Sequence, residues 1–418
     1  MIEAASITED SRPRSDARAA SAPLAPAAAA AQATTPLPHV LFLIDRFVGP
    51  HSGAESALVK MIRLLPREKF RCSLVIFGVN PALNLSEIFS CTVYCFNLRR
   101  TYDWNAMKTA WELSSLIRRE NVSIVHSFFE TSDLWGGTIA KLSGVPILVS
   151  SRRDMGIQRE KKHDSAYKFM RRFTDLVLPV SNQVRDFCIE RDGLDPKKVV
   201  TLYNGVEIQR FDNNGGNETV RYAFGLENSS HIISAIANIR PVKGLDVMIR
   251  AAAIVCRKFP RAYFVIVGMP HRAVFLRELK ALARELGIAE NIRFLGGHDE
   301  IERFLKISNV FCLPSRSEGF SNSLIEAMGC GLPCVATDVG GNREALEEGV
   351  SGYLVANEDS QSMGERIVNL LENPEPAHRM GAAGRRKVEQ MFTAEAMMST
   401  LIGHYQSLLD QKCNGRQS

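Results

Sequence analysis

Two glutamates, Glu318 and Glu326, are the residues of this 418-residue chain whose type and spacing point most directly to chemistry. They lie in the segment SRSEGFSNSLIEAMGCGLPC, where a strand that ends at Pro314 leads into a polar loop and then into a helix that begins near Ser321. Backbone N–H groups at the start of a helix attract phosphate and hydroxyl oxygens, and a carboxylate can accept two hydroxyl protons. The pattern therefore predicts a site that holds phosphate and sugar-like hydroxyl groups between two carboxylates.

A purely structural explanation exists for one of these glutamates. Ser323 and Glu326 match the S-x-x-E capping box, in which the glutamate only reaches back to a backbone N–H. Spacing alone leaves this interpretation and the functional one equally open. Glu318 lies beside a glycine in the loop, where it has no helix to cap, so a solvated surface carboxylate is its structural alternative.

Lys243 and His126 are further candidates, each with a structural alternative. Lys243 precedes a glycine at an expected helix start, where a cation opposes the helix dipole, so an anion is expected nearby. A plain surface lysine is the alternative. His126 lies near the carboxyl end of the apolar run SIVHSFF and would face a cleft there, although a lone histidine on such a strand is more often a core residue.

The elements that must position these residues form two series of strands and helices. The first series of apolar runs is HVLFLID, SLVIFG, TVYCFNL, SIVHSFF, VPILVSS, DLVLPVS and VVTLYNGV, and the second is HIISAIANI, AYFVIVG, NIRFLGG, NVFCLPS, LPCVATDV and SGYLVA. Continuous apolar strands separated by helices predict parallel sheets covered on both faces. We therefore expect an α/β chain with two Rossmann-like doubly wound domains that face each other across a cleft and bind ligands at the carboxyl ends of the strands.

Composition sets the domain limits and excludes several classes. The first 36 residues are rich in Ala, Pro, Ser and Thr and are expected to form a disordered tail, 1–36, without a signal peptide. The polar stretch 212–217 marks a junction, which predicts an N-terminal domain, 37–205, and a C-terminal domain, 206–391. No apolar run is long enough to span a bilayer, and the net charge of +5 is too small to argue for nucleic acid.

The nine cysteines lie mostly in apolar runs, which is typical of reduced thiols in a cytoplasmic protein. Both C-x-x-x-C pairs lack further ligands at zinc spacing, and the chain contains no Asp-x-Asp pair. We therefore expect no metal site.

Five blocks of the sequence resemble glycosyltransferase family 4, over about residues 38–400. EGFSNSLIEAM is similar to the family's Glu-x7-Glu signature, SGAESAL to its glycine-rich loop, and IVHSFF to its His-bearing fourth strand. LYNGVEIQRF is similar to its interdomain NGV block, and TDVGGNRE to the loop after the second glutamate. The order of the blocks along the chain is also that of the family.

The resemblance implies a GT-B fold and a retaining transfer of a sugar from a nucleotide-diphosphate sugar to an acceptor hydroxyl. It also implies that the last helix, 392–418, returns to the N-terminal domain. No metal or other cofactor takes part in such a transfer, and the nucleotide sugar is a co-substrate. Protein cations then neutralise the departing diphosphate. Arg240 and Lys243 occupy the expected region, although the family's arginine usually lies about five residues before the lysine.

The resemblance also implies roles for single residues. Glu326 would bind the nucleotide's ribose, Glu318 a hydroxyl of the donor sugar, and His126 the sugar or the diphosphate. The family often has a second His or Thr in the His126 block, where this chain has HSF. The expected catalytic residues are His126, Lys243 and Glu318, and the expected donor-binding residues are Gly53, Arg240, Lys243, Glu318, Phe320, Ser321, Asn322 and Glu326.

The acceptor side is expected around a basic stretch, 152–172, that begins with Arg152 and Arg153 and carries eight Arg or Lys against three acids. Its interleaved aromatic residues would allow it to rest on an anionic membrane, and a solvated helix that covers the sheet is an equally open alternative. On the membrane interpretation the enzyme is peripheral on the inner face of the cell membrane, and its acceptor is a lipid-linked sugar that grows into a polysaccharide or glycolipid.

Two other functions fit the same architecture. A nucleotide-sugar 2-epimerase would act on the donor alone. A catalytically silent scaffold or nucleotide-sugar binding protein would be expected to have lost charged residues of the cleft, yet Lys243, Glu318 and Glu326 are present. A dinucleotide oxidoreductase is disfavoured, because no G-x-G-x-x-G follows the first strand.

Overall fold

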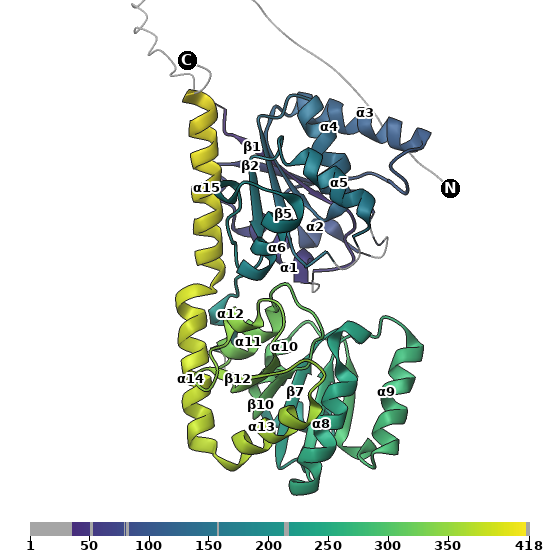
Figure 1. Ribbon diagram of the computed structural model, residues 1–418, viewed down its shortest axis with the longest axis vertical. Coiled ribbons are helices and arrows are strands. Elements are labelled where there is room, and N and C mark those ends of the chain that lie inside the picture. Colours follow the sequence, from purple (N-terminus) through teal and green to yellow (C-terminus); the bar gives the residue numbers. More distant parts are fainter. Residues whose placement is uncertain are drawn as a thin grey trace, which may run out of the picture. The chain divides into compact units, whose positions relative to one another are not determined.

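The N-terminal half folds around a parallel sheet whose strands are six of the seven apolar runs of the first series. The seventh run, VVTLYNGV at 199–206, was wrongly expected to be a strand, because only its end residues Val199 and Val206 pair, each as an isolated bridge. This computed structural model describes residues 36–414 apart from 51–52, 79, 81–82, 157–158 and 213–216, so the expected tail, 1–36, lies outside the described residues except for Pro36. The strands are β1 (His39–Ile44), β2 (Arg71–Ile76), β3 (Thr92–Cys95), β4 (Val122–Phe128), β5 (Ile147–Arg152) and β6 (Leu176–Pro179). They pair in the order β3-β2-β1-β4-β5-β6, and every residue of β1 is buried because helices cover both faces of the sheet (Figure 1).

The helices of this half follow the strands in turn. They are α1 (Gly53–Leu64), α2 (Leu85–Ile88), α3 (Trp104–Arg119), a π-helical turn (Ser132–Gly136), α4 (Gly137–Leu142), α5 (Lys161–Met170) and α6 (Asn182–Asp192). Asp103 caps α3 by accepting a hydrogen bond from the N–H of Ala106 at 2.8 Å, and Ser181 caps α6 by accepting one from the N–H of Val184 at 3.2 Å.

The C-terminal half repeats the arrangement. Its strands are β7 (His231–Ile236), β8 (Ala262–Val267), β9 (Ile292–Gly296), β10 (Val310–Leu313), β11 (Cys334–Thr337) and β12 (Gly352–Val355), in the order β12-β11-β10-β7-β8-β9. Its helices are α7 (Asn217–Ala223), α8 (Leu245–Lys258), α9 (Ala273–Glu285), α10 (Ile301–Lys306), α11 (Asn322–Gly329), α12 (Asn342–Ala345), α13 (Ser360–Glu372) and α14 (Pro374–Met391).

Both sheets share one strand order, in which the first and fourth strands of each half lie side by side. These are β1 with β4 and β7 with β10. The direction of winding changes between such strands, so the loops at their carboxyl ends diverge and leave room for a ligand. The expectation of two doubly wound parallel sheets is confirmed.

The last helix, α15 (Ala394–Asn414), belongs to the core of the N-terminal half. Met397, Leu401 and Tyr405 are buried among side chains of β1, β4 and α1. The chain enters this helix beside the point where it first left that half, because Val206 pairs with Thr393 as an isolated bridge. Residues almost two hundred positions apart in the sequence therefore connect the two halves at one place.

Candidate active site

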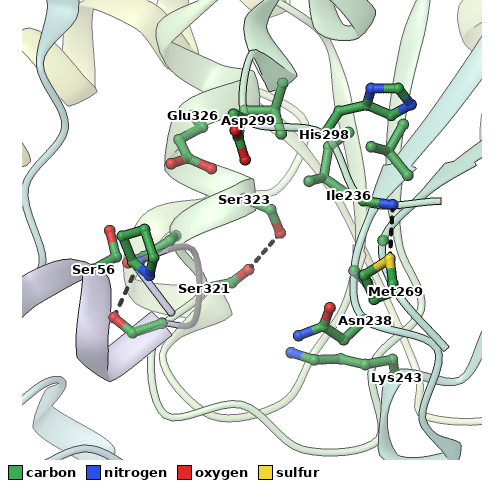
Figure 2. A pocket seen from close by; sticks show the side chains of 18 of the residues that line it. Ser56, Ile236, Asn238, Lys243, Met269, His298, Asp299, Ser321, Ser323 and Glu326 are labelled. Atoms are coloured by element: carbon green, nitrogen blue, oxygen red, sulfur yellow. Dashed lines mark hydrogen bonds between the residues drawn. The ribbon is translucent and has the colours of Figure 1, made fainter. Parts of the chain in front are cut away.

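A cavity of about 700 Å³ is lined by the residues at the carboxyl ends of strands in the C-terminal sheet and by one face of α1. The C-terminal half contributes Asn238, Arg240, Lys243, Gly268, Met269, His298, Asp299 and the segment from Glu318 to Glu326, and α1 contributes Gly53, Ser56, Val59, Lys60 and Arg63. Figure 2 shows labelled side chains from α1, from α11 and from the loops that follow the strands, such as Ser56, Glu326 and Asn238, around one space. The cavity is large enough to hold a small molecule of nucleotide size.

Helix α11 supplies one wall of the cavity, and its first turn decides between the two interpretations of Glu326. The N-cap is Ser321, whose Oγ accepts a hydrogen bond from the N–H of Leu324 at 3.3 Å. Ser323 lies inside the helix, with its Oγ 3.2 Å from that of Ser321. The capping-box alternative for Ser323 and Glu326 is therefore wrong, and Glu326 lines the cavity from the second turn of the helix (Figure 2).

Glu318 is held by two donors on one oxygen. Lys243 Nζ and Ser315 Oγ both lie 2.6 Å from Oε1, and the Glu318 side chain is only 10% exposed. The backbone of Glu318 also has a close neighbour, because Gly340, with φ of +56°, approaches so closely that a Cβ there would lie 1.7 Å from the Glu318 carbonyl oxygen. The position of this carboxylate therefore depends on both a lysine and a glycine.

Lys243 reaches Glu318 because of the turn that precedes α8. Pro241–Lys243 form a short 3-10 turn, and Gly244 follows with φ of +60° as the N-cap of α8. A Cβ on Gly244 would lie 2.0 Å from the carbonyl oxygen of Pro314, so this glycine lets the turn pack against the end of β10. The anion expected beside Lys243 is present, and it is the carboxylate of Glu318.

Arg240 also lines the cavity, but it is exposed, and its side chain has no hydrogen bond or ion pair among those identified between the described residues. Asn238 occupies the position five residues before Lys243, and Figure 2 shows its side chain next to that of Lys243. Asn238 was not among the residues expected at the site. The spacing of five residues was the signal that could have identified it.

His126 does not face the cavity, so the expectation that it would do so is wrong. Its side chain is completely buried, with Nδ1 2.6 Å from the Tyr405 hydroxyl and Nε2 2.8 Å from the Ser151 hydroxyl. Burial lowers the pKa of His126 from 6.5 to about 3, so the ring is neutral. Phe128, two residues further along the strand, is buried as well, and the structural alternative for His126 is the correct one.

Gly53, Asn322 and Phe320 line the cavity as expected, and each makes a different kind of contact. A Cβ on Gly53 would meet no atom within 4 Å, so the described residues do not require glycine there. The Gly53 carbonyl accepts a hydrogen bond from the Asn322 side chain at 3.2 Å, which joins α1 to the start of α11. The Phe320 side chain is buried, and its ring packs against the rings of Tyr203 and Phe392, which supports the loop.

Arg152 does not lie on an outer surface, which corrects its assignment to a membrane-facing stretch. Its guanidinium stacks 3.7 Å above the centre of the Tyr167 ring and forms ion pairs with Asp133 at 3.3 Å and Asp192 at 3.8 Å. Arg159, from the same basic stretch, pairs with Asp192 at 2.6 Å. These charges compensate one another inside the N-terminal half.

Arg153 is partly exposed, and a chain of hydrogen bonds connects it with residues that line the cavity. Nη1 donates to Asn204 Oδ1 at 2.7 Å, Asn204 Nδ2 donates to Asn322 Oδ1 at 2.7 Å, and Asn322 then bonds to Gly53. Burial lowers the pKa of Arg153 to about 10. Three hydrogen bonds thus connect the end of β5 with the first residues of α11 and α1.

Lys60 is a cavity residue that sequence reasoning missed. It is 7% exposed, and its Nζ donates to the Gly205 carbonyl at 2.9 Å. Burial lowers the pKa of Lys60, while the charges of Glu326 and Glu207 oppose that shift. A lysine within the buried face of an amphipathic helix, in SALVKMIRLL, was the available signal.

Charged side chains of both signs line the cavity, and they do not form a metal site. The cations are Lys60, Arg63, Arg210, Arg240 and Lys243, and the anions are Glu207, Asp299, Glu318 and Glu326. Within the described ranges, no three His, Cys, Asp or Glu side chains gather where they could hold a metal ion.

Two family models match consecutive parts of the chain. "Glycosyltransferase Family 4" matches residues 51–210, and "Glycosyl transferases group 1" matches residues 217–387. The chain belongs to glycosyltransferase family 4. The two models together match parts of both halves of this glycosyltransferase. Residues of both matched regions line the cavity.

Relatives of the transferase are similar over most of their length. The UDP-Gal:alpha-D-GlcNAc-diphosphoundecaprenol alpha-1,3-galactosyltransferase of Escherichia coli is 25% identical over 338 residues, which cover 77% of this chain and 85% of that protein. The N-acetyl-alpha-D-glucosaminyl L-malate synthase of Bacillus anthracis is 26% identical over 313 residues, 73% of this chain and 80% of that protein.

Solved structures show that the fold is that of GT-B enzymes. HepE of Anabaena in complex with UDP superposes with a TM-score of 0.79 at 20% identity, covering 88% of this chain and 99% of that chain. The two-sheet architecture expected from the sequence is thereby confirmed.

Proposed function

We propose that this glycosyltransferase moves a sugar from a nucleotide-diphosphate sugar to an acceptor hydroxyl, with retention of configuration and without a metal ion, in the assembly of a polysaccharide or glycolipid. One observation carries the proposal. The start of α11, Glu326 and the Lys243–Glu318 pair surround a single cavity at the carboxyl ends of the strands.

The donor's diphosphate fits the start of α11. The N–H groups of Asn322 and Ser323 belong to the first turn, where an α-helix has no internal acceptors. Together with the positive end of the helix dipole and Lys243, they would stabilise the charge that develops on the diphosphate as its bond to the sugar breaks. Removal of one such donor typically raises the barrier by about 2.7–4 kcal/mol.

The two carboxylates would then hold the two ends of the donor. Glu326 lies one turn further along α11, where it can accept hydrogen bonds from the ribose hydroxyls. Glu318 receives Lys243 and Ser315 on Oε1, which orients the carboxylate toward a hydroxyl of the transferred sugar. Retention of configuration rests on family membership.

The acceptor is proposed to be a lipid-linked sugar at an anionic membrane surface. The E. coli relative is named for a sugar carried on diphosphoundecaprenol, and it is similar to this chain over 85% of its length. None of the helices in the described part of the chain is long and apolar enough to span a bilayer.

The test is a donor screen with the purified full chain in EDTA. UDP-, GDP- and ADP-sugars are incubated with and without a polyprenyl-diphosphate sugar, and nucleotide diphosphate release is measured for the wild type, for Glu326→Ala and for Glu278→Ala. Glu278 is an exposed glutamate of α9 outside the cavity and serves as the matched control. We expect release that needs the acceptor, persists in EDTA, disappears in Glu326→Ala and is unchanged in Glu278→Ala.

The same assay separates the alternative functions. A 2-epimerase would convert the donor sugar without an acceptor, which NMR of the sugar would show. A silent binding protein would bind a nucleotide in calorimetry without releasing diphosphate from any donor. Loss of activity in EDTA that Mg²⁺ restores would contradict the metal-independent part of the proposal.

A further inference from the structure

The outer side of α3 carries an unusual group of exposed apolar side chains. Trp104 is 83% exposed, Met107 62% and Trp111 69%, and Tyr102, just before the helix, is 82% exposed. Single exposed apolar residues are ordinary on protein surfaces, but four within ten residues of one segment are not. Of the remaining exposed large apolar residues of the described chain, Phe169 and Phe173 lie together near the end of α5, and the others lie apart on other elements.

Helical spacing places these residues on one stripe. Positions 104, 107, 108, 111 and 118 recur at intervals of three, four and seven residues, so they share one side of the helix. The opposite side carries Ala106, Leu113 and Ile117, which are buried against the N-terminal core. Helix α3 therefore has two apolar faces, and only the inner one is covered by the described residues.

Positive charges accompany the outer stripe. Arg99 and Arg100 precede the helix, Lys108 lies beside Trp111 on the stripe, and Arg118 and Arg119 follow at its end, all of them exposed. Asp103 caps the helix, whereas Glu112 lies 3.7 Å from Lys108 and Glu120 lies 3.2 Å from Arg119. The cations for which no ion pair is identified among the described residues are Arg99, Arg100 and Arg118. Tryptophan side chains surrounded by arginine and lysine match the boundary of an anionic bilayer, where the rings enter the headgroup region and the cations meet lipid phosphates.

We propose that the outer face of α3, formed by Trp104, Met107, Lys108 and Trp111 with the flanking arginines, docks this glycosyltransferase on an anionic phospholipid bilayer. The choice of a bilayer as the partner rests on the proposed lipid-linked acceptor. The basic stretch 152–172 is a weaker candidate for the same role, because Arg152, Arg153 and Arg159 are used inside the protein.

A groove beside this face strengthens the inference. It has a volume of about 560 Å³ and is lined by Tyr102 and Met107 of the docking segment, by Trp135 and Ile139, and by the His163–Glu130 pair. Figure 1 shows α3 beside α4, the helix that carries Ile139. Tyr102 and Met107 belong to both surfaces, so docking through α3 would bring the mouth of an apolar groove against the lipid.

The test measures binding of the full chain to vesicles without any substrate. Vesicles of phosphatidylcholine alone and with phosphatidylglycerol are floated on a density gradient with the protein, and tryptophan fluorescence is recorded with brominated lipids as quenchers. The chain contains three tryptophans, so a Trp104→Ser/Trp111→Ser variant retains only Trp135 as background. We expect flotation with the anionic vesicles, quenching of the wild type, and loss of most quenching in this variant.

Two charge variants complete the design. One kcal/mol for each basic residue near an anionic surface corresponds to about fivefold in affinity, so Arg99→Glu/Arg100→Glu should weaken vesicle binding by about thirtyfold or more. Arg272→Glu/Arg284→Glu makes the same change in charge at exposed arginines of the C-terminal half and should leave binding nearly unchanged. Tyr222→Ser, at an aromatic residue that is 78% exposed, is the control for the tryptophan variant.

Three results would overturn the docking proposal. Binding that survives in both α3 variants but disappears in Lys168→Glu/Arg171→Glu would assign the membrane to α5. Burial of Trp104 and Trp111 without lipid, together with a concentration-dependent mass, would show that a second copy of the chain covers the face. Absence of binding to every vesicle would exclude docking, and calorimetry with UDP would show independently whether the donor site is intact.

Discussion

At the scale of single residues, predictions were correct where the surroundings of a side chain are local in sequence and wrong where its partners are distant in sequence. Glu326 and Lys243 were placed correctly in the cavity, because a polar loop between a strand and a helix determines their surroundings locally. His126 was misplaced because its partner, Tyr405, lies 279 residues away in sequence. Arg152, at the end of β5, was misplaced for the same reason, since its partner Asp192 comes from the end of α6. Long-range partners of this kind leave no local pattern.

His126 should make stability depend on pH. Its pKa is about 3 in the folded protein and 6.5 ordinarily, so below pH 6.5 the unfolded chain takes up a proton that the folded chain does not. The contribution of the neutral ring is complete above pH 6.5 and falls by up to about 1.4 kcal/mol per pH unit as the pH decreases toward 3. This contribution is measured by comparing the free energies of denaturant unfolding of the wild type and of His126→Gln at pH 7.5, 6 and 5.

We expect the stability advantage of the wild type over His126→Gln to shrink as the pH falls, with kcat at pH 7.5 nearly unchanged in the variant. A large loss of kcat in a variant that remains folded would instead restore a catalytic role for this histidine.

Lys243 should affect the chemical step more than nucleotide binding. Its charge lies 2.6 Å from Glu318 and faces the cavity where the diphosphate is proposed to depart. Lys243→Ala should lower kcat by about 100- to 1000-fold, the effect of one lost stabilising donor. Transfer kinetics and calorimetry with the nucleotide measure the two effects separately, with Lys69→Ala at an exposed site as the control. Equal losses in kcat and in nucleotide affinity would contradict a role in the transition state.

At the scale of elements, the alternation of apolar runs and helices was sufficient to predict the sheets. A strand that is buried on both faces must be apolar throughout, and twelve of the thirteen runs identified in the sequence are close to the twelve strands of the described chain. The exception is VVTLYNGV, whose apolar residues made it look like a strand although it forms only isolated bridges. The local details of the site were harder to predict from the sequence. The N-cap of α11 is Ser321, and the sequence offered Ser323 as an equally good candidate.

The variant Gly340→Ala tests how far the reaction depends on the position of the loop around Glu318. A methyl group there would lie 1.7 Å from the Glu318 carbonyl oxygen, so Gly340→Ala must displace that backbone. Gly331 has a similar positive φ of +75° but nothing within 4 Å of the added Cβ, so Gly331→Ala carries only the conformational cost of about 1–2 kcal/mol. We expect both variants to lose stability and only Gly340→Ala to lose most of its transferase activity.

Measured side by side, thermal unfolding and transfer rates distinguish the two effects. Equal activity of Gly340→Ala and Gly331→Ala would mean that the position of the Glu318 carboxylate does not limit the reaction.

At the scale of the whole molecule, the chain is not simply two consecutive halves. Helix α15 follows the C-terminal half in sequence but completes the core of the N-terminal half, and Tyr405 bonds to His126 at the centre of that core. The return of the last helix was implied by family resemblance, since the hydrophobic pattern of an amphipathic helix does not say which core it covers.

Leu401 allows this connection to be measured. Its side chain is completely buried among residues of the N-terminal half, so Leu401→Ala should destabilise that half by about 2–5 kcal/mol. Leu142→Ala removes the same atoms from a side chain that is 79% exposed and should change stability by less than about 0.5 kcal/mol.

Hydrogen exchange followed by mass spectrometry should show faster exchange in β1 and β4 of Leu401→Ala, although the substitution lies more than 270 residues from β4 in sequence. If the acceptor binds at the N-terminal half and the nucleotide at the C-terminal half, as proposed, loosening of these strands should also lower transfer more than nucleotide binding. Unchanged exchange in β1 and β4 would show that α15 covers the core without stabilising it, and the N-terminal half would then have to be stable without its last helix.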